Sequence, residues 1–223
     1  MIRIAALIAL LGGLAAGGLV TTIVLIFVLR AWWSTPFEVL GFGGPPEQPI
    51  PFPHAVHAGL GDLLDKDGNV VTYADGQPKT ALGLDCTYCH RNVDKGAAAS
   101  VPPVEQCIFC HKVVQEGEDN PLPGLANLIS AWENKDPVVW ERVHRLPDSV
   151  RFVHEAHMRY FTQPGNLLPS GEQAMVAADV CSTCHGDVAA MAEVKQVRSL
   201  KMGDCLDCHR DYGAPTDCTT CHY

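Results

Sequence analysis

The sequence predicts a mainly irregular chain with short α-helices and one membrane-spanning helix at its N-terminus. Three observations support this fold class: a long uncharged apolar run near the start, 20 Gly and 16 Pro among 223 residues, and ten cysteines that all lie in Cys-x-x-Cys pairs. The formal net charge is −9, and only 18% of the residues are charged. An acidic chain without a basic stripe is not expected to bind nucleic acid.

The apolar run covers residues 4–29 and contains no charged residue. As a helix it would be about 39 Å long, which is enough to cross a bilayer with some tilt. A cleaved signal peptide is the alternative, but its apolar core is shorter and precedes a small-x-small cleavage site. Here the run ends in Arg30-Ala31-Trp32-Trp33, which suits the membrane interface. We therefore predict a retained anchor over residues 1–30, in contact with the lipid bilayer.

Residues 31–51 are rich in proline and glycine, so we expect an extended linker there. The remaining residues, 52–223, are expected to form one domain that contains all the cysteines and histidines.

Each of the five Cys-x-x-Cys pairs is followed at once by a histidine. Numbered from the N-terminus, these first to fifth motifs are Cys86-Thr-Tyr-Cys89-His90, Cys107-Ile-Phe-Cys110-His111, Cys181-Ser-Thr-Cys184-His185, Cys205-Leu-Asp-Cys208-His209 and Cys218-Thr-Thr-Cys221-His222. Two thiols three residues apart share one helical turn and can form thioethers with the vinyl groups of one haem. The next imidazole then ligates the iron. The sequence therefore predicts five covalently bound haem c groups.

Other functions of the Cys-x-x-Cys pairs explain the pattern less well. Zinc sites do not require a histidine after every pair, and disulfides leave the histidines unexplained. Thioredoxin-like chemistry needs a βαβ context, which is absent. Because c-type haems are attached outside the cytoplasm, we expect a single-pass protein of the cytoplasmic membrane with its haem domain on the periplasmic side.

Five histidines lie outside the motifs and equal the motifs in number: His54, His57, His144, His154 and His157. They predict a distal histidine for every iron, and such a closed coordination sphere favours electron transfer over substrate binding. Ordinary surface histidines are the alternative. His144 could be a docked loop histidine, and Met191 and Met202 are competing distal ligands for one haem.

Four of these histidines belong to a repeated pattern. Phe52-Pro-His54-Ala-Val-His57 recurs 100 residues later as Phe152-Val-His154-Glu-Ala-His157, and the copies precede two and three motifs respectively. This pattern predicts an internal duplication over about 52–111 and 152–209, with an extra haem at the C-terminus. Since one iron has room for only one more ligand, each pair is expected to reach two neighbouring haems.

The domain offers fewer than 40 residues per haem, so porphyrin faces must supply much of the buried apolar surface. We expect short helices at the motifs, joined by irregular loops. Residues 65–73 predict a small hairpin with an Asp67-Gly68 turn. Residues 125–132 predict an amphipathic helix, and Trp132 and Trp140 could pack in the core or contact another subunit.

These features resemble multihaem cytochromes of the cytochrome c7/c3-like type, in particular the pentahaem subunit of bacterial alternative complex III. The resemblance rests on five motifs after one anchor, the Phe-Pro-His-x-x-His segment, and the runs Val143-His-Arg-Leu-Pro-Asp-Ser-Val-Arg-Phe-Val-His-Glu-Ala-His157 and Leu200-Lys-Met-Gly-Asp-Cys-Leu-Asp-Cys-His209. It covers most of residues 50–223.

The resemblance implies a subunit of a quinol-oxidising respiratory or photosynthetic membrane complex. Electrons would enter from an iron–sulfur protein and leave towards a monohaem cytochrome or a soluble electron acceptor. Polytopic subunits would bind the quinol, since the single helix offers no ionisable group to take its proton. This chain would be an electron carrier without its own substrate site.

Two other functions are kept as alternatives. A stand-alone membrane quinol dehydrogenase that feeds a periplasmic reductase would need a haem near the membrane, whereas the first motif lies about 55 residues after the anchor. A multihaem reductase of a small nitrogen or sulfur compound would need an open iron position, and the ligand count leaves none.

Overall fold

The computed structural model describes residues 2–32, 44–65, 67–115, 117, 122–198 and 200–223. The chain divides into two units, Met1–Gly44 and Pro45–Tyr223. Most of the predicted linker, residues 33–43, lies outside the described residues. So do Trp33 and the side chains of Arg30 and Trp32, which we expected at the membrane interface.

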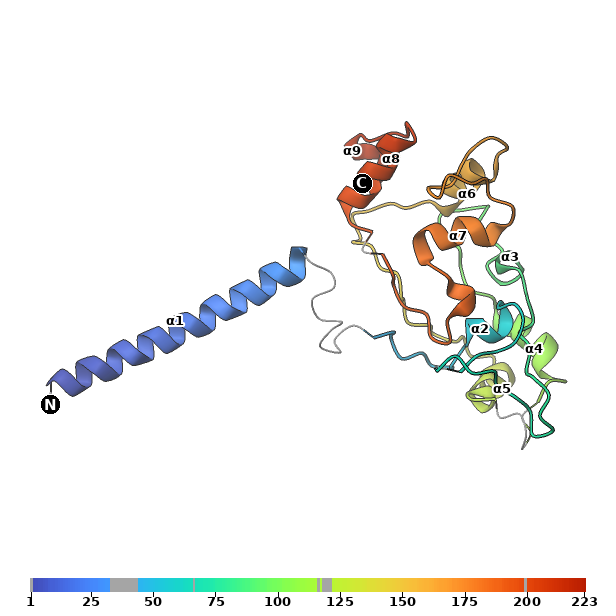
Figure 1. Cartoon of the computed structure of the whole chain (residues 1–223), viewed down its shortest axis with the longest axis horizontal. Coiled ribbons are helices and arrows are strands. Elements are labelled where there is room, and N and C mark those ends of the chain that lie inside the picture. Colours follow the sequence, from blue (N-terminus) through green and yellow to red (C-terminus); the bar gives the residue numbers. More distant parts are fainter. Residues whose placement is uncertain (1, 33–43, 66, 116, 118–121, 199) are drawn as a thin grey trace. The chain divides into compact units, whose positions relative to one another are not determined.

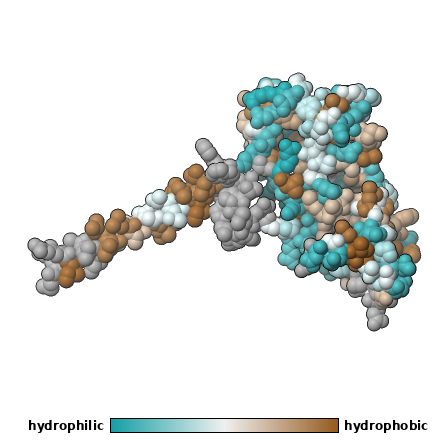
Figure 2. Space-filling view, viewed as in Figure 1, coloured by the Kyte–Doolittle hydropathy of each residue, from teal (hydrophilic) through white to brown (hydrophobic). Residues whose placement is uncertain are grey.

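The described part of the first unit is almost entirely one helix, α1, Ile2–Trp32. Its segment Leu10–Leu29 is long and apolar enough to cross a membrane, as the sequence predicts, and its described side chains are exposed along the helix (Figure 2). The hydroxyls of Thr21 and Thr22 donate to the Gly17 and Gly18 carbonyls at 2.9 and 2.8 Å. These polar groups are therefore satisfied within the helix, as an apolar environment requires.

The second unit consists of short helices and irregular segments, and its described part contains no β-strand (Figure 1). The helices are α2 (His54–His57), α3 (Cys86–Cys89), α4 (Val104–His111), α5 (Leu125–Asn134), α6 (His154–Thr162), α7 (Ala177–His185), the 3₁₀ turn η2 (Val188–Ala190), α8 (Met202–Asp211) and α9 (Cys218–Cys221). The coarse fold class predicted from the sequence, short helices in a mainly irregular chain, is therefore confirmed.

Two local predictions are also confirmed. An antiparallel bridge joins Leu64 to Val70 across the expected turn, and Gly68 there has a φ of 85°, which favours glycine. Lys66, within this turn, lies outside the described residues. The predicted amphipathic helix is α5, which buries Leu128 and leaves Trp132 partly exposed.

The buried core of the second unit is small and divided. One cluster contains Val93, Met158, Phe161, Leu168 and Val180, and it joins α6 and α7 to the loop after α3. The other contains Ile50, Ile108 and Leu128, with Trp140 packed against it. The structure therefore favours a core position for Trp140. In the described part of the chain no side chain is completely enclosed.

Many apolar side chains of this unit face the solvent instead. Leu60 is 88% exposed, Met175 86%, Val113 78% and Val139 75%. A soluble domain of this size normally buries most of such surface. The protein atoms alone therefore leave much of the apolar surface without a partner.

The larger cluster predicts a measurable stability difference between two leucine positions. Leu168 is 7% exposed within the cluster, and Leu60 is 88% exposed. We expect Leu168→Ala to lower the free energy of unfolding by about 3 kcal/mol, because it leaves a cavity. The matched variant Leu60→Ala should change it by less than about 0.5 kcal/mol. Urea unfolding of the full chain in detergent, followed by circular dichroism, measures both; equal effects would contradict the assignment of this core.

Candidate functional site

All five Cys-x-x-Cys-His motifs begin on a helical turn, in α3, α4, α7, α8 and α9. The two shortest turns start after an aspartate. Asp85 accepts a hydrogen bond from the backbone N–H of Thr87 at 2.8 Å. Asp217 accepts from the hydroxyls of Thr219 and Thr220 at 2.7 and 2.8 Å. A carboxylate at this position stabilises the start of a helix, so the sequence itself fixes where these turns begin.

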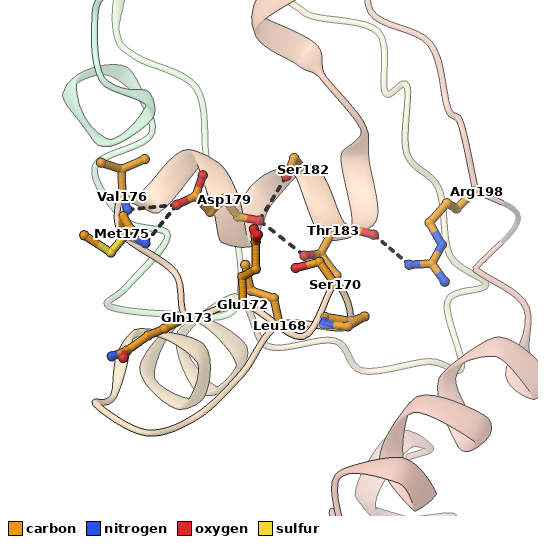
Figure 3. A pocket seen from close by; sticks show the side chains of 11 residues that line it. Leu168, Ser170, Glu172, Gln173, Met175, Val176, Asp179, Ser182, Thr183 and Arg198 are labelled. Atoms are coloured by element: carbon orange, nitrogen blue, oxygen red, sulfur yellow. Dashed lines mark hydrogen bonds between the residues drawn. The ribbon is translucent and has the colours of Figure 1, made fainter.

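Two of the three longer motif helices, α7 and α8, use an aspartate in their first turn. In α7, Asp179 accepts from the backbone N–H groups of Met175 and Val176 at 2.8 and 3.1 Å (Figure 3). In α8, Asp204 accepts from the Lys201 N–H at 2.8 Å. Acidic side chains therefore anchor four of the five motif helices, α3, α7, α8 and α9.

All ten cysteines lie in the described residues, and none forms a disulfide. Burial raises the pKa of several of their thiols above the ordinary value: those of Cys89, Cys107, Cys184, Cys205 and Cys208. Among the described residues, no three His, Cys, Asp or Glu side chains gather where they could hold one metal ion. A tetrahedral zinc site, which needs such a group, therefore has no support here.

Histidines from distant parts of the chain face one another in pairs. The ring centroids of His57 and His111 are 6.2 Å apart at an interplanar angle of 50°. Those of His157 and His209 are 6.1 Å apart at 48°. The two pairs thus have nearly the same geometry, and each combines a motif histidine with the second histidine of a His-x-x-His segment.

A third pair has the same spacing. His154, the first histidine of its segment, lies 6.3 Å from His185 between ring centroids, with the ring planes 7° apart. Two imidazoles that ligate one metal from opposite sides, each through a bond of about 2.0 Å, have centroids about 6 Å apart. The three pairs are therefore spaced as two ligands of one metal ion are.

The two His-x-x-His segments have the same local structure. Phe52 lies edge-on to His54 at 4.9 Å and stacks on His57 at 4.3 Å. Phe152 lies edge-on to His154 at 4.8 Å and stacks on His157 at 4.5 Å. In both copies an aromatic ring thus fixes the direction of the second imidazole.

Most of these histidines have one ring nitrogen engaged by the backbone. The Nδ1–H groups of six of them donate to carbonyl oxygens: His57 to Pro53, His90 to Ser100, His154 to Ala97, His157 to Val153, His209 to Pro215 and His222 to Ser149. Because a carbonyl can only accept, each ring carries its proton on Nδ1. In a neutral ring the lone pair of Nε2 is then free, which is the arrangement of metal-ligating histidines.

Burial also keeps several rings neutral. It lowers the pKa of His54 to about 4, with the nearby His90 and His57 adding to the effect. Burial also lowers the pKa of His185 to about 4, and the nearby rings of His144, His154 and His90 add smaller contributions in the same direction. Neutral imidazole is the form that binds a metal. The buried Nδ1 atoms of His54 and His111 have no hydrogen-bond partner among the described protein atoms.

The other predicted distal ligands differ in their surroundings. His144 lies against His185, with ring centroids 4.2 Å apart and its Nε2 3.1 Å from Nδ1 of His185. In the described part of the chain no histidine ring is paired in this way with His222. The competing methionines lie elsewhere: Met191 follows η2, where its carbonyl accepts from Ala55, and Met202 is 63% exposed at the start of α8.

Comparison of the chain with protein-family models and with curated proteins finds no match. The site must therefore be interpreted from its own geometry.

Some residues of the site were not predicted from the sequence. The carbonyl acceptors of Ser100, Ala97 and Ser149 lie 10, 57 and 73 residues from the histidines that they bind. Arg198, which donates to the Thr183 carbonyl at 2.6 Å, was also missed (Figure 3). Every residue has a backbone carbonyl, so the residue type does not indicate which carbonyl accepts a hydrogen bond, and the sequence could not predict these contacts.

Gly186 directly after His185 gives a testable prediction. Its φ of 72° and ψ of −168° are nearly restricted to glycine, and an added Cβ would lie 2.9 Å from Val197. Gly171 also has a positive φ, 85°, but open space around it. We expect Gly186→Ala to lower the free energy of unfolding by about 3 kcal/mol, and the control Gly171→Ala by about 1 kcal/mol. Urea titration of the two variants measures the difference; similar midpoints would argue against a packed position for Gly186.

Proposed function

We propose that this chain is a membrane-anchored multihaem c-type cytochrome that relays electrons through five covalently bound haem groups. The observation that carries this proposal is the spacing of 6.1–6.3 Å between facing histidine rings. Each of these pairs joins a motif histidine to a histidine from outside the motifs. Neither chance burial nor a zinc site accounts for this combination at three places.

The residues present fit haem c. Each motif offers two thiols for thioether bonds and one imidazole for the iron, while the porphyrin itself supplies four further ligands. Two protein ligands per iron therefore suffice, so no cluster of three protein ligands is needed. When bound, haem c supplies one-electron redox chemistry at its iron.

The ring pairs support a distal ligand for each of three motifs: His57 for the second, His154 for the third and His157 for the fourth. The matching geometry of the two His-x-x-His segments supports His54 for the first motif, where His90 is its electrostatic neighbour. His144 is assigned to the fifth motif by elimination alone, because its ring lies against His185 of the third motif.

A distal histidine on every iron supports electron transfer rather than catalysis on a substrate. The chain's residues then hold each iron at a fixed distance from the next, and no position is left for a small molecule to bind. This distinguishes the proposed carrier from a multihaem reductase.

The motif order and the single apolar helix further support membership of a quinol-oxidising complex of the alternative complex III type. The segment Leu10–Leu29 has no ionisable side chain that could take a proton from quinol. Quinol oxidation is therefore assigned to polytopic partner subunits, with an iron–sulfur protein as donor and a monohaem cytochrome or soluble protein as acceptor. The periplasmic side is proposed for Pro45–Tyr223, because c-type haems are attached there.

Haem content is the first test. We expect five haem c groups per chain in the purified full-length protein, measured as the pyridine haemochrome against amino-acid analysis. The double variant Cys218→Ser, Cys221→Ser should hold four. EPR of the oxidised protein should show only low-spin signals, because every iron has two axial imidazoles. Absence of haem would refute the proposal, and a high-spin five-coordinate signal would favour the reductase instead.

Membership of a complex is tested separately. Membranes are extracted with a mild detergent, separated on a native gel and stained for haem peroxidase activity, and the stained band is analysed by mass spectrometry. We expect a large assembly with an iron–sulfur protein and polytopic subunits. Migration of the chain alone, or with only a soluble reductase, would support the stand-alone quinol dehydrogenase.

A further inference from the structure

The five motif helices are neighbours in an order that differs from their order in the sequence. Figure 1 shows α4, which carries the second motif, and α9, which carries the fifth, at opposite ends of the unit Pro45–Tyr223, with α3 and α7 between them. The contacts between successive helices establish the order one step at a time.

The second motif contacts the first. The side-chain amide of Gln106 in α4 donates to the carbonyl oxygen of Tyr88 in α3 at 2.6 Å. Burial, and after it the neighbouring Cys89 thiol, raises the pKa of Cys107. Helix α4 also packs against α5 and Ile50, and His57 of α2 faces His111. Among the motif helices in the described part of the chain, α3 is thus the one that α4 contacts through a hydrogen bond.

The first motif contacts the third across the two repeats. Helix α3 packs against α7, and the thiols of Cys86 and Cys181 are close enough to act on each other's pKa. The loop after the first motif also holds the start of α6, since His154 donates through both its backbone N–H and its Nδ1–H to the carbonyl of Ala97. The thioether positions of the first and third motifs thus lie side by side.

The third motif contacts the fourth through one arginine and one helix. Arg198 donates to the carbonyl of Thr183, inside the third motif (Figure 3). The charge of Arg198 acts on the thiols of both Cys184 and Cys208. From α6, His154 faces the third motif and His157 faces the fourth. One turn of helix therefore separates the ligands of these two centres.

The fourth motif contacts the fifth. Only eight residues separate His209 from Cys218, and the chain turns back between them, with Nδ1 of His209 bonded to the Pro215 carbonyl. The Cys221 thiol is among the groups that act electrostatically on Cys205, after burial and Asp204.

We propose, building on the haem-binding function above, that the five haems form one row in the order second, first, third, fourth, fifth. Electrons then cross between the two repeats from the first to the third haem. The outer positions of the row belong to the haems of His111 and His222, so these are the two centres that exchange electrons with partner proteins. A row in sequence order would instead place the haem of His90 at one end.

Three distal-ligand variants of the full-length protein test this order. His57→Met, His54→Met and His157→Met are expected to place methionine on the second, first and fourth haem respectively, which raises the potential of that haem. A 695 nm band verifies the new ligand. One equivalent of reductant then makes only the altered haem diamagnetic, and EPR shows whether any remaining ferric haem has lost all its magnetic neighbours.

The proposed order predicts an isolated, uncoupled low-spin signal in His54→Met, where the second haem loses its single neighbour. His57→Met should give no such signal, because the other four haems stay contiguous. His157→Met serves as the positive control, since it isolates the fifth haem in either order. The signal in His57→Met and its absence in His54→Met would overturn the proposal in favour of sequence order.

The iron positions of the unaltered protein give a second measurement, independent of whether the variants assemble. An anomalous-scattering map of crystals of the full chain should place one iron near that of His111, namely the iron of His90. The iron of His185 should then lie next to that of His90; if it lies next to that of His111 instead, as sequence order requires, the proposed order is overturned. The haem count of the same sample separates the two proposals, because five haems in a different order refute the row alone, whereas absence of haem refutes the function.

Discussion

The distance between facing histidine rings constrains the rest of this structure. Three pairs, each built from segments far apart in the chain, have ring centroids within 6.1–6.3 Å. Under the proposed function each pair holds one metal ion, and such a site tolerates deviations of only about 0.5 Å, so the helices that carry these rings must be held accurately. The pairs tie α2 to α4 and α6 to both α7 and α8. The connecting segments need only hold these helices at the right positions, which explains why the segments can be irregular.

The carbonyl groups around the rings add an electronic constraint. Six Nδ1–H groups are bonded to the backbone, and such a bond raises the basicity of the other ring nitrogen. Under the proposed function, a more basic ligand stabilises the oxidised iron and lowers its potential. The irregular loops thus supply the acceptors that a regular helix or strand would keep for its own hydrogen bonds.

The sequence predicted the local parts of the site and not its long-range pairing. The position of every motif on a helical turn follows from the thiol spacing, and α5 follows from its apolar periodicity. The same spacing puts His54 and His57 on one turn. It does not say which motif each of them faces, because that depends on how segments about 30 to 55 residues apart pack. The contact of His144 with His185 also depends on tertiary packing, and the residue types around His144 gave no sign of it.

The exposed apolar side chains described above have a consequence for how the chain is made. Met175, Val113 and Val139 are each at least three-quarters exposed, and the two small core clusters cannot compensate for them. Under the proposed function, a chain that had missed one haem-attachment step would keep such surface open, which favours aggregation and cleavage by proteases. Incompletely loaded chains would thus be removed before assembly, and only chains with all five haems attached would persist long enough to join a partner.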